Sequence, residues 1–164
     1  MVVLKGTLIC RLITSNISLK VLTKNMVIVD SGFWIALINR RDDYHVLAQE
    51  VLDTIDEPLV TTWCVITEAC HILLKRTGTN AQQTFIHSLE IGAFEVFDLK
   101  VQDGKRISEL MNQYSSLPMD LADASLIILA EHLGHGRILS VDFRDFNTYR
   151  WKNRHPFENL MSIN

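Results

Sequence analysis

Four acidic residues stand in or directly after apolar segments that are spread along the whole chain. Asp30 follows residues 26–29, Glu68 lies in 65–69, Asp123 lies in 120–125, and Asp142 follows 138–141. Carboxylates that converge repel one another unless a cation lies between them, and hard oxygen ligands suit Mg²⁺ or Mn²⁺. If the fold brings these four together, the chemistry they support is that of a metal-dependent phosphodiesterase.

Each acid has a simpler explanation when it is considered alone. Asp30 is equally suited to capping a short helix that follows it, and Glu68 to pairing with a base on an exposed helical face. Asp120 is well placed to be a helix N-cap, and either Asp142 or Asp145 could cap the turn that follows. The prediction of a metal site therefore rests on the serial placement of the acids and not on any single one.

Alternating strands and helices would position these acids. Short apolar runs predict strands at 27–29, 59–61, 94–97 and 137–141, with a fifth near the end of the chain. Apolar residues at helical spacing and capping residues predict helices at 33–39, 44–55, 64–75, 81–89, 101–114 and 121–133. This alternation predicts a three-layer α/β/α fold around a mostly parallel sheet of four to five strands. The carboxyl ends of such strands meet at one edge of the sheet.

Length and composition indicate one ordinary globular domain. The 164 residues are 48% hydrophobic and 21% charged, and the net charge of -3 neither indicates nor excludes a nucleic-acid partner. No apolar run reaches the roughly 18 residues of a membrane-spanning helix. Cys10, Cys64 and Cys70 form no paired motif, so we expect buried free thiols in a reducing compartment. Residues 26–164 are the expected domain, and 1–25 are an N-terminal extension or a mis-assigned start.

Four short motifs in series carry a family resemblance. They are Ile28-Val29-Asp30-Ser31-Gly32, Thr67-Glu68-Ala69, Leu121-Ala122-Asp123-Ala124-Ser125, and Leu139-Ser140-Val141-Asp142-Phe143-Arg144-Asp145-Phe146. With these motifs, residues 26 to about 160 resemble the PIN-domain ribonucleases, and most closely the VapC-type toxins of bacterial toxin–antitoxin pairs. Each motif is short enough to occur by chance, whereas all four in this order are specific.

The resemblance implies a role for each acid. Asp30, Glu68, Asp123 and Asp142 correspond to the acidic quartet of the family, which would bind Mg²⁺ or Mn²⁺ and catalyse cleavage of RNA. Ser31, Asp120 and Asp145 are expected accessory residues. Where many relatives have Thr, this chain has Ser140, which keeps a hydroxyl group. We expect Asp30, Asp123 and Asp142 to face the metal and Glu68 to complete the cluster, with one ion or two.

Basic residues outside the acidic pocket would hold the RNA. Arg144, Arg150 and Lys152 are the leading candidates, and Tyr149 and Trp151 between them are possible stacking surfaces. Further candidates are Arg40, Arg41 and Arg154. For any one of these bases a solvated surface position is the simpler interpretation. The resemblance also implies a small antitoxin protein as partner, a homodimer, and a cytoplasmic location without membrane association.

Other functions are compatible with parts of the sequence. A PIN-fold nuclease could act in RNA processing without being a toxin, and a PIN-like fold could be a non-catalytic binding module. A histidine pair could catalyse RNA cleavage without a metal, although no motif brings two histidines together. A phosphatase with an aspartyl-phosphate intermediate would need a second Asp where this chain has Gly32.

Overall fold

The computed structural model describes residues 25–117 and 119–162. Most of the expected N-terminal extension, residues 1–24, lies outside this part of the chain, and so do Cys10 and Pro118. Of the helices in the described ranges, none is both long enough and apolar enough to cross a membrane.

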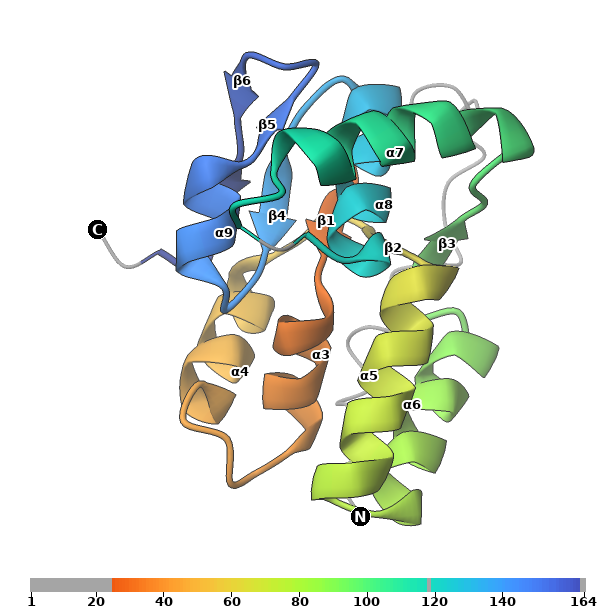
Figure 1. Ribbon diagram of the computed structural model, residues 1–164. Coiled ribbons are helices and arrows are strands. Elements are labelled where there is room, and N and C mark those ends of the chain that lie inside the picture. The colour runs from red at the N-terminus through yellow and green to blue at the C-terminus, as the bar shows by residue number, and fades with distance from the viewer. Residues whose placement is uncertain (1–24, 118, 163–164) are drawn as a thin grey trace, which may run out of the picture.

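A five-stranded parallel sheet forms the centre of the molecule (Figure 1). Its strands, in the order β3-β2-β1-β4-β7, are β3 (Glu95–Phe97), β2 (Leu59–Thr62), β1 (Val27–Val29), β4 (Arg137–Leu139) and β7 (Glu158–Asn159). All four neighbouring pairs are parallel. The first strand of the described residues, β1, is thus central, and later strands are added on both sides of it. This confirms the predicted sheet, including its fifth strand.

Helices connect the strands, largely where the spacing of apolar residues predicts them. They are α3 (Ser31–Ile38), α4 (His45–Thr54), α5 (Trp63–Arg76), α6 (Thr79–Glu90), α7 (Gly104–Gln113), α8 (Leu121–Leu133) and α9 (Phe143–Thr148). A second, two-stranded antiparallel sheet follows α9 and pairs β5 (Arg150–Trp151) with β6 (His155–Pro156).

Two predicted boundaries are wrong for local reasons. The helix expected to start at residue 101 begins at Gly104, because residues 101–103 form a 3₁₀ turn (η2) in which the Lys100 amide donates to the Asp103 carboxylate at 2.7 Å. The strand expected to reach residue 141 ends at Leu139. The Ser140 amide and carbonyl instead bond the Asn159 side chain, at 3.3 and 2.8 Å.

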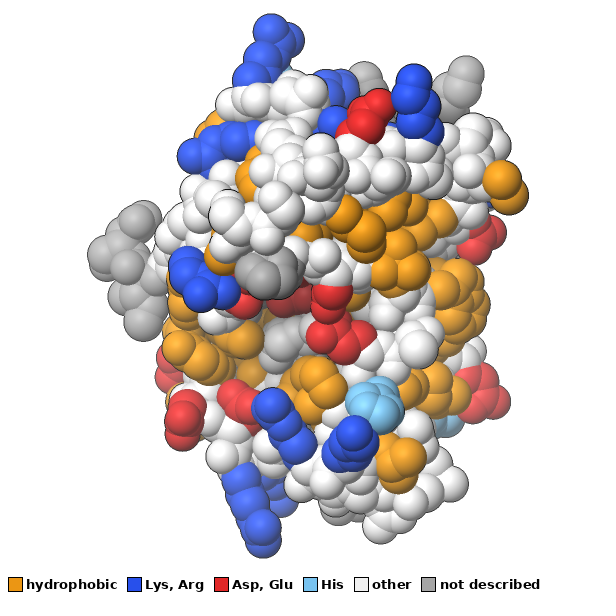
Figure 2. All heavy atoms as spheres, viewed as in Figure 1, with side chains coloured by type: hydrophobic (Ala, Val, Ile, Leu, Met, Phe, Trp, Pro, Cys, Tyr) orange, Lys and Arg blue, Asp and Glu red, His pale blue; other side chains and the backbone are white. Residues whose placement is uncertain are grey.

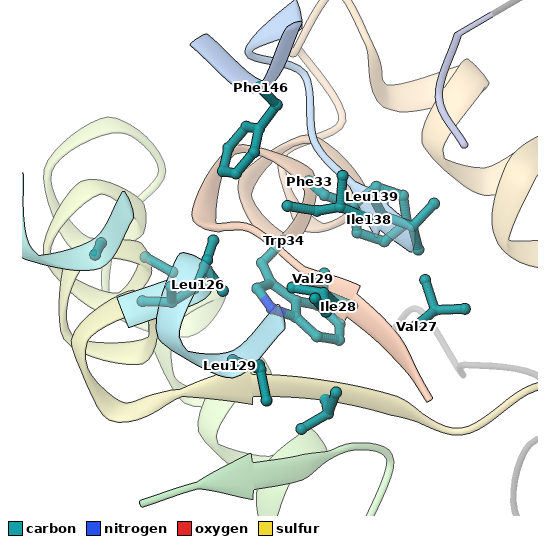
Figure 3. Close-up of a cluster of buried hydrophobic side chains, with 14 of the residues drawn as sticks. Val27, Ile28, Val29, Phe33, Trp34, Leu126, Leu129, Ile138, Leu139 and Phe146 are labelled. Carbon is teal, nitrogen blue, oxygen red and sulfur yellow. The ribbon is translucent and has the colours of Figure 1, made fainter. Parts of the chain in front are cut away.

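The helices form layers around the sheet. α8 packs on β1 and β2, with α7 against its outer side, while α3 packs with α4, α5 and α6 (Figure 1). The strand β1 is completely buried, and its side chains lie among those of α3, α8 and β4 (Figure 3). On α3, the Trp34 ring lies 4.6 Å from that of Phe94 and 5.6 Å from that of Phe85, measured between ring centroids. This packing holds the carboxyl end of β1 in place.

The two cysteines in the described residues are free thiols, as expected. Cys64 and Cys70, both on α5, are only partly buried, however. The prediction that these two thiols are buried is therefore wrong, whereas the prediction that they are free is confirmed.

Candidate active site

Asp30 lies at the point where the order of the strands reverses. It follows β1 directly, and β1 pairs with β4 so that Val29 lies opposite Leu139. The Asp30 amide donates to the Leu139 carbonyl at 3.0 Å, and the Ser140 hydroxyl donates to Asp30 Oδ2 at 2.8 Å. Ligands of open α/β sheets bind in the crevice at such a switch point. The carboxylate of Asp30 is therefore at the position where this class of fold places a site.

The Asp30 carboxylate is buried, and it also caps a helix. Its Oδ1 accepts the Ser31 amide at 2.6 Å at the start of α3, so the capping and site interpretations hold together. The pKa of Asp30 is raised from 3.8 to about 6, mainly by burial and in smaller part by the nearby charge of Glu68. The hydrogen bond from Ser140 opposes this shift. The fold thus holds a carboxyl group here against its preference for water.

Asp123 lies in the first turn of α8, where small neighbours surround it. Its pKa is raised from 3.8 to about 8 by burial, by the charge of Asp120 and by the charge of Asp30. One hydrogen bond acts in the opposite direction, because Tyr149 Oη donates to Asp123 Oδ2 at 3.0 Å. Asp120 itself accepts the Asp123 amide at 2.9 Å and is exposed. Asp120 is therefore the N-cap of α8 as predicted, and its charge also reaches the site.

Glu68 comes from α5, which follows β2 in the sheet. Its side chain is half-buried, and burial together with the charge of Asp120 raises its pKa. The Ser31 hydroxyl lowers this pKa through a hydrogen bond. Asp30, Glu68, Asp120 and Asp123 are thus close enough to act on one another although they come from three separate parts of the chain.

Asp142 and Asp145 take different positions, and one of them is the cap that the sequence allowed for either residue. The Asp142 carboxylate is exposed and accepts the Asp145 amide at 3.1 Å, which makes Asp142 the N-cap of α9. Its own amide donates to Ser140 Oγ at 2.9 Å, which links it to Asp30 through one hydroxyl group. Asp145 is buried, pairs with Arg144 at 2.8 Å, and raises the pKa of Asp123. Of the two, Asp145 therefore acts more directly on the other acids.

The acids gather on one face of the molecule without a matching base. Figure 2 shows acidic side chains in a hollow in the middle of this face, with lysines and arginines farther out. Within residues 25–117 and 119–162, no lysine, arginine or histidine forms an ion pair with Asp30, Glu68, Asp120 or Asp123. The described part of the chain therefore supplies no base that pairs with this cluster.

The cluster suits a hydrated divalent cation better than a closed cage. In the described part of the chain, no group of three or more His, Cys, Asp or Glu side chains is drawn together tightly enough to hold a metal ion. Mg²⁺ dehydrates reluctantly and is usually bound through one or two carboxylates and several waters. Oxygen donors with raised pKa values fit such an ion, because the ion favours their charged form.

The basic residues of the tail differ from one another in their surroundings. Arg144 and Lys152 are exposed, and the Lys152 ammonium lies 5.5 Å from the centre of the Trp151 ring. Arg150 Nη1 instead donates to the carbonyls of Asn147, Thr148 and Tyr149, at 2.8 to 3.0 Å. Arg150 therefore closes the end of α9, which weighs against a role in RNA binding.

Two aromatic residues differ from the sequence prediction: Tyr149 was predicted as a stacking surface, and Trp63 was not predicted near the site. Tyr149 is fully buried, so it is not a stacking surface for RNA, and its hydroxyl instead reaches Asp123. The cluster has a neighbour in Trp63, which is 52% exposed at the first residue of α5. Its position directly after a strand, like that of Asp30, was a usable signal.

Arg76, at the far end of α5, lines a separate depression beside Gly32 together with Arg41.

A comparison with protein families decides the classification. The family model of the PIN domain matches residues 27–152, which include all the acids described above. The chain is a PIN-domain protein. Its resemblance to this family, based on four short motifs, is thereby confirmed, and the three-layer fold of the PIN domain is the one observed.

Known proteins that are similar to this chain share limited sequence identity with it but cover most of its length. Ribonuclease VapC26 of Mycobacterium tuberculosis is 23% identical over 124 residues, which are 76% of this chain and 92% of the relative. The crystal structure of Mycobacterium tuberculosis VapC20, described as a Sarcin-Ricin loop cleaving toxin, superposes with a TM-score of 0.67 at 18% identity, covering 72% of this chain and 91% of that one. The crystal structure of VapBC2 from Rickettsia felis, bound to a DNA fragment from its promoter, superposes with a TM-score of 0.58 at 15% identity. The match covers 82% of this chain and 98% of that one.

Proposed function

We propose that this protein is a Mg²⁺- or Mn²⁺-dependent endoribonuclease and the toxin of a type II toxin–antitoxin pair. The observation that carries the proposal is the cluster of Asp30, Glu68 and Asp123, which has no paired base among the described residues and in which burial and neighbouring acids raise the pKa values. Membership of the PIN family supports a nuclease. The similarity to VapC26 and VapC20 supports RNA as the substrate and a toxin as the biological role.

The catalytic residues in this proposal are Asp30, Glu68, Asp123 and Asp142. When bound, a divalent cation would neutralise charge on the phosphodiester and make the attacking water more acidic. Asp30 and Asp123 are the leading ligands, because Asp30 is buried, Asp123 is partly buried, and the charge of Asp30 raises the pKa of Asp123. Ser140 and Tyr149 orient them by donating to Asp30 Oδ2 and to Asp123 Oδ2. Asp142 would contribute from the rim, and Glu68 from the wall formed by α5.

Ser31, Asp120 and Asp145 are accessory residues in the same scheme. The Ser31 hydroxyl acts on Glu68, and Asp120 and Asp145 both act on Asp123. These three residues influence the pKa values of Glu68 and Asp123, and so the charge of the site when no cation is bound. Arg144 and Lys152 are proposed RNA contacts, since both are exposed and basic.

The test of the enzymatic proposal compares wild type with Asp30→Asn on a panel of transfer, ribosomal and messenger RNA. Cleavage should require Mg²⁺ or Mn²⁺, stop in EDTA, and be lost in Asp30→Asn. Asp53→Asn is the matched control, because Asp53 is an exposed acid on α4 outside the cluster. Cleavage that persists in Asp30→Asn and in EDTA would exclude the metal–carboxylate mechanism, and would favour histidine catalysis.

The biological part of the proposal has a separate test. A cytoplasmic toxin should arrest growth when its expression is induced, and co-expression of a small neighbouring gene product should relieve the arrest. VapC-type toxins are expected to form homodimers and to be inhibited by an antitoxin segment in the cleft, so the complex should not cleave RNA. Cleavage without growth arrest would instead support a nuclease of RNA processing, and the absence of both would support a non-catalytic PIN-like module.

A further inference from the structure

A cleft with an exposed tryptophan adjoins the acidic cluster. It lies between the N-terminal parts of α5 and α8, has a volume of about 580 Å³, and is lined by Trp63, Glu68, His71, Asp120 and Leu121 among others. Glu68 and Asp120 belong to the cluster, so the cleft opens directly onto the acids. It is large enough to admit one nucleotide unit of a bound strand.

Trp63 presents an aromatic surface to this cleft without packing against another ring. Its side chain is 52% exposed, and none of the ring pairs among the described residues includes it. By contrast, Trp34 is buried among phenylalanines, and Trp151 stacks on His155 at 4.3 Å. Leu121 contributes a second apolar side chain from α8 and is 47% exposed. The cleft therefore joins a flat aromatic surface to an aliphatic one.

The charges of the cleft indicate which part of a nucleotide it accepts. Glu68 and Asp120 would repel a phosphate group, but carboxylates accept hydrogen bonds from the N–H groups of bases. No arginine lines this cleft in the described part of the chain. Arg41 and Arg76 instead line a separate depression, which also includes Gly32 near the end of β1. The cleft is thus suited to a base, and the surface beyond Gly32 to the backbone.

We infer that Trp63 stacks against one unpaired base of an RNA strand whose phosphodiester lies at the acidic cluster. This inference deepens the proposed ribonuclease function and rests on it for the identity of the strand. Aromatic stacking requires the base to be turned out of any helix, because a base within a duplex has no free face. The proposed contact therefore requires an unpaired base at this position of the bound strand.

The test measures binding separately from cleavage. In the Asp30→Asn background with Mg²⁺, fluorescence anisotropy would give the affinity for a labelled single-stranded oligoribonucleotide. Trp63→Leu keeps an apolar side chain but removes the ring, and we expect it to weaken binding about 5- to 150-fold, the range for loss of one stacked base. Trp63→Tyr should retain most of the affinity, because it retains a ring.

Two controls separate stacking from general effects on the surface. Ile86→Ala removes an apolar side chain that is 43% exposed on α6 and does not line the cleft, and it should bind as the parent protein does. A fully paired duplex of the same sequence should bind equally to the parent and to Trp63→Leu. Equal binding of the single strand by these two proteins would overturn the inference, as would an equal loss with the duplex.

The oligomeric state distinguishes a protein interface from a base-binding site. Light scattering on Trp63→Leu should give the mass of the parent protein. A change in mass with unchanged affinity per protomer would assign Trp63 to an interface and overturn the inference. If wild type binds single strands through Trp63 but cleaves none, the ribonuclease proposal alone fails. If wild type cleaves RNA and Trp63→Leu binds like the parent, the stacking inference alone fails.

Discussion

The hydroxyl group of Tyr149 donates to Asp123 Oδ2 at 3.0 Å, which joins the end of α9 to the first turn of α8. Tyr149 is completely buried, and its ring packs edge-on against those of Tyr114 and Phe146. The packing of its ring therefore holds Tyr149 in position independently of the hydrogen bond. The hydrogen bond lowers the pKa of Asp123, against the burial and charges that raise it to about 8. Tyr149 is thus an orienting residue for an acid of the site.

Tyr149→Phe should move the pH dependence of RNA cleavage to higher pH. Removing the donor raises the pKa of Asp123 further, so a higher pH is needed to ionise the carboxylate that binds the cation. We also expect the free energy of unfolding to fall by about 1–2 kcal/mol. Cleavage rates between pH 6 and pH 9 at fixed Mg²⁺, and denaturant unfolding, measure the two effects.

Tyr114→Phe is the matched control for Tyr149→Phe. The Tyr114 hydroxyl accepts the Arg150 amide at 2.9 Å and makes no contact with the acids that the structure records. Its loss should lower stability without moving the pH profile. Identical pH profiles for Tyr149→Phe and wild type would show that the hydroxyl of Tyr149 serves only stability.

Ser140→Ala should impair the site, and Ser140→Thr should preserve it. The Ser140 hydroxyl donates to Asp30 and accepts the Asp142 amide, so its loss removes two hydrogen bonds from the join between β1 and β4. We expect cleavage to fall at neutral pH and the unfolding free energy to fall by about 1–3 kcal/mol. Ser88→Ala is the control, because Ser88 is a buried serine on α6 outside the site. Full activity of Ser140→Ala would contradict the orienting role.

Stability in EDTA should fall as the pH rises from about 4 to about 8. The folded-state pKa values of Asp30 and Asp123 are raised to about 6 and about 8, so the folded protein binds more protons than the unfolded chain in this range. We expect a loss of about 1–3 kcal/mol, smaller than the full shifts imply because Asp123 is partly exposed. Chemical denaturation at several pH values measures it.

Mg²⁺ should reverse part of this loss, because an ion that binds only the folded protein stabilises it. Asp123→Asn should be more stable than wild type at pH 8 in EDTA, since it removes an unfavourable charge, and Mg²⁺ should stabilise it less. A stability that rises with pH in EDTA would be inconsistent with the raised pKa values.

Asp142→Asn should separate the charge of this residue from its capping role. Asparagine caps helices about as well as aspartate, so the stability of α9 should be retained. If Asp142 contributes its charge from the rim, RNA cleavage should fall at least about tenfold, which is about 1.4 kcal/mol of transition-state stabilisation. Asp142→Ala removes the cap as well and should also lower stability. Wild-type cleavage by Asp142→Asn would reduce Asp142 to a helix cap.

Substitution of Arg150 should affect stability, whereas substitution of Lys152 should affect RNA binding. Arg150→Ala removes the donor to three carbonyls at the end of α9, so it should lower stability by about 1–3 kcal/mol. Lys152→Gln should leave stability unchanged, weaken RNA binding, and reduce its salt dependence by roughly one phosphate contact. Binding titrations at several salt concentrations test this. If the salt dependence of RNA binding is the same for Lys152→Gln and wild type, Lys152 does not contact the RNA.

Local sequence determined which elements form, most of their bounds, and which acids stand at their ends. The run Val27–Val29 is a strand because it is apolar and β-branched, and Asp30 ends it and caps the helix that follows. The helix Leu121–Leu133 has the bounds that its apolar residues and the cap Asp120 predict. These features depend on neighbouring residues only, so one sequence is enough to find them.

The tertiary structure alone decided how the acids face one another and what surrounds them. Both Asp142 and Asp145 suit a cap or a site, and the packing of α9 makes Asp142 the cap and buries Asp145. Tyr149 lies in a basic, aromatic stretch typical of an RNA surface, yet packing turns its hydroxyl toward Asp123, 26 residues away in sequence. Side-chain direction depends on contacts between segments that are distant in the chain, and spacing along the sequence does not contain that information.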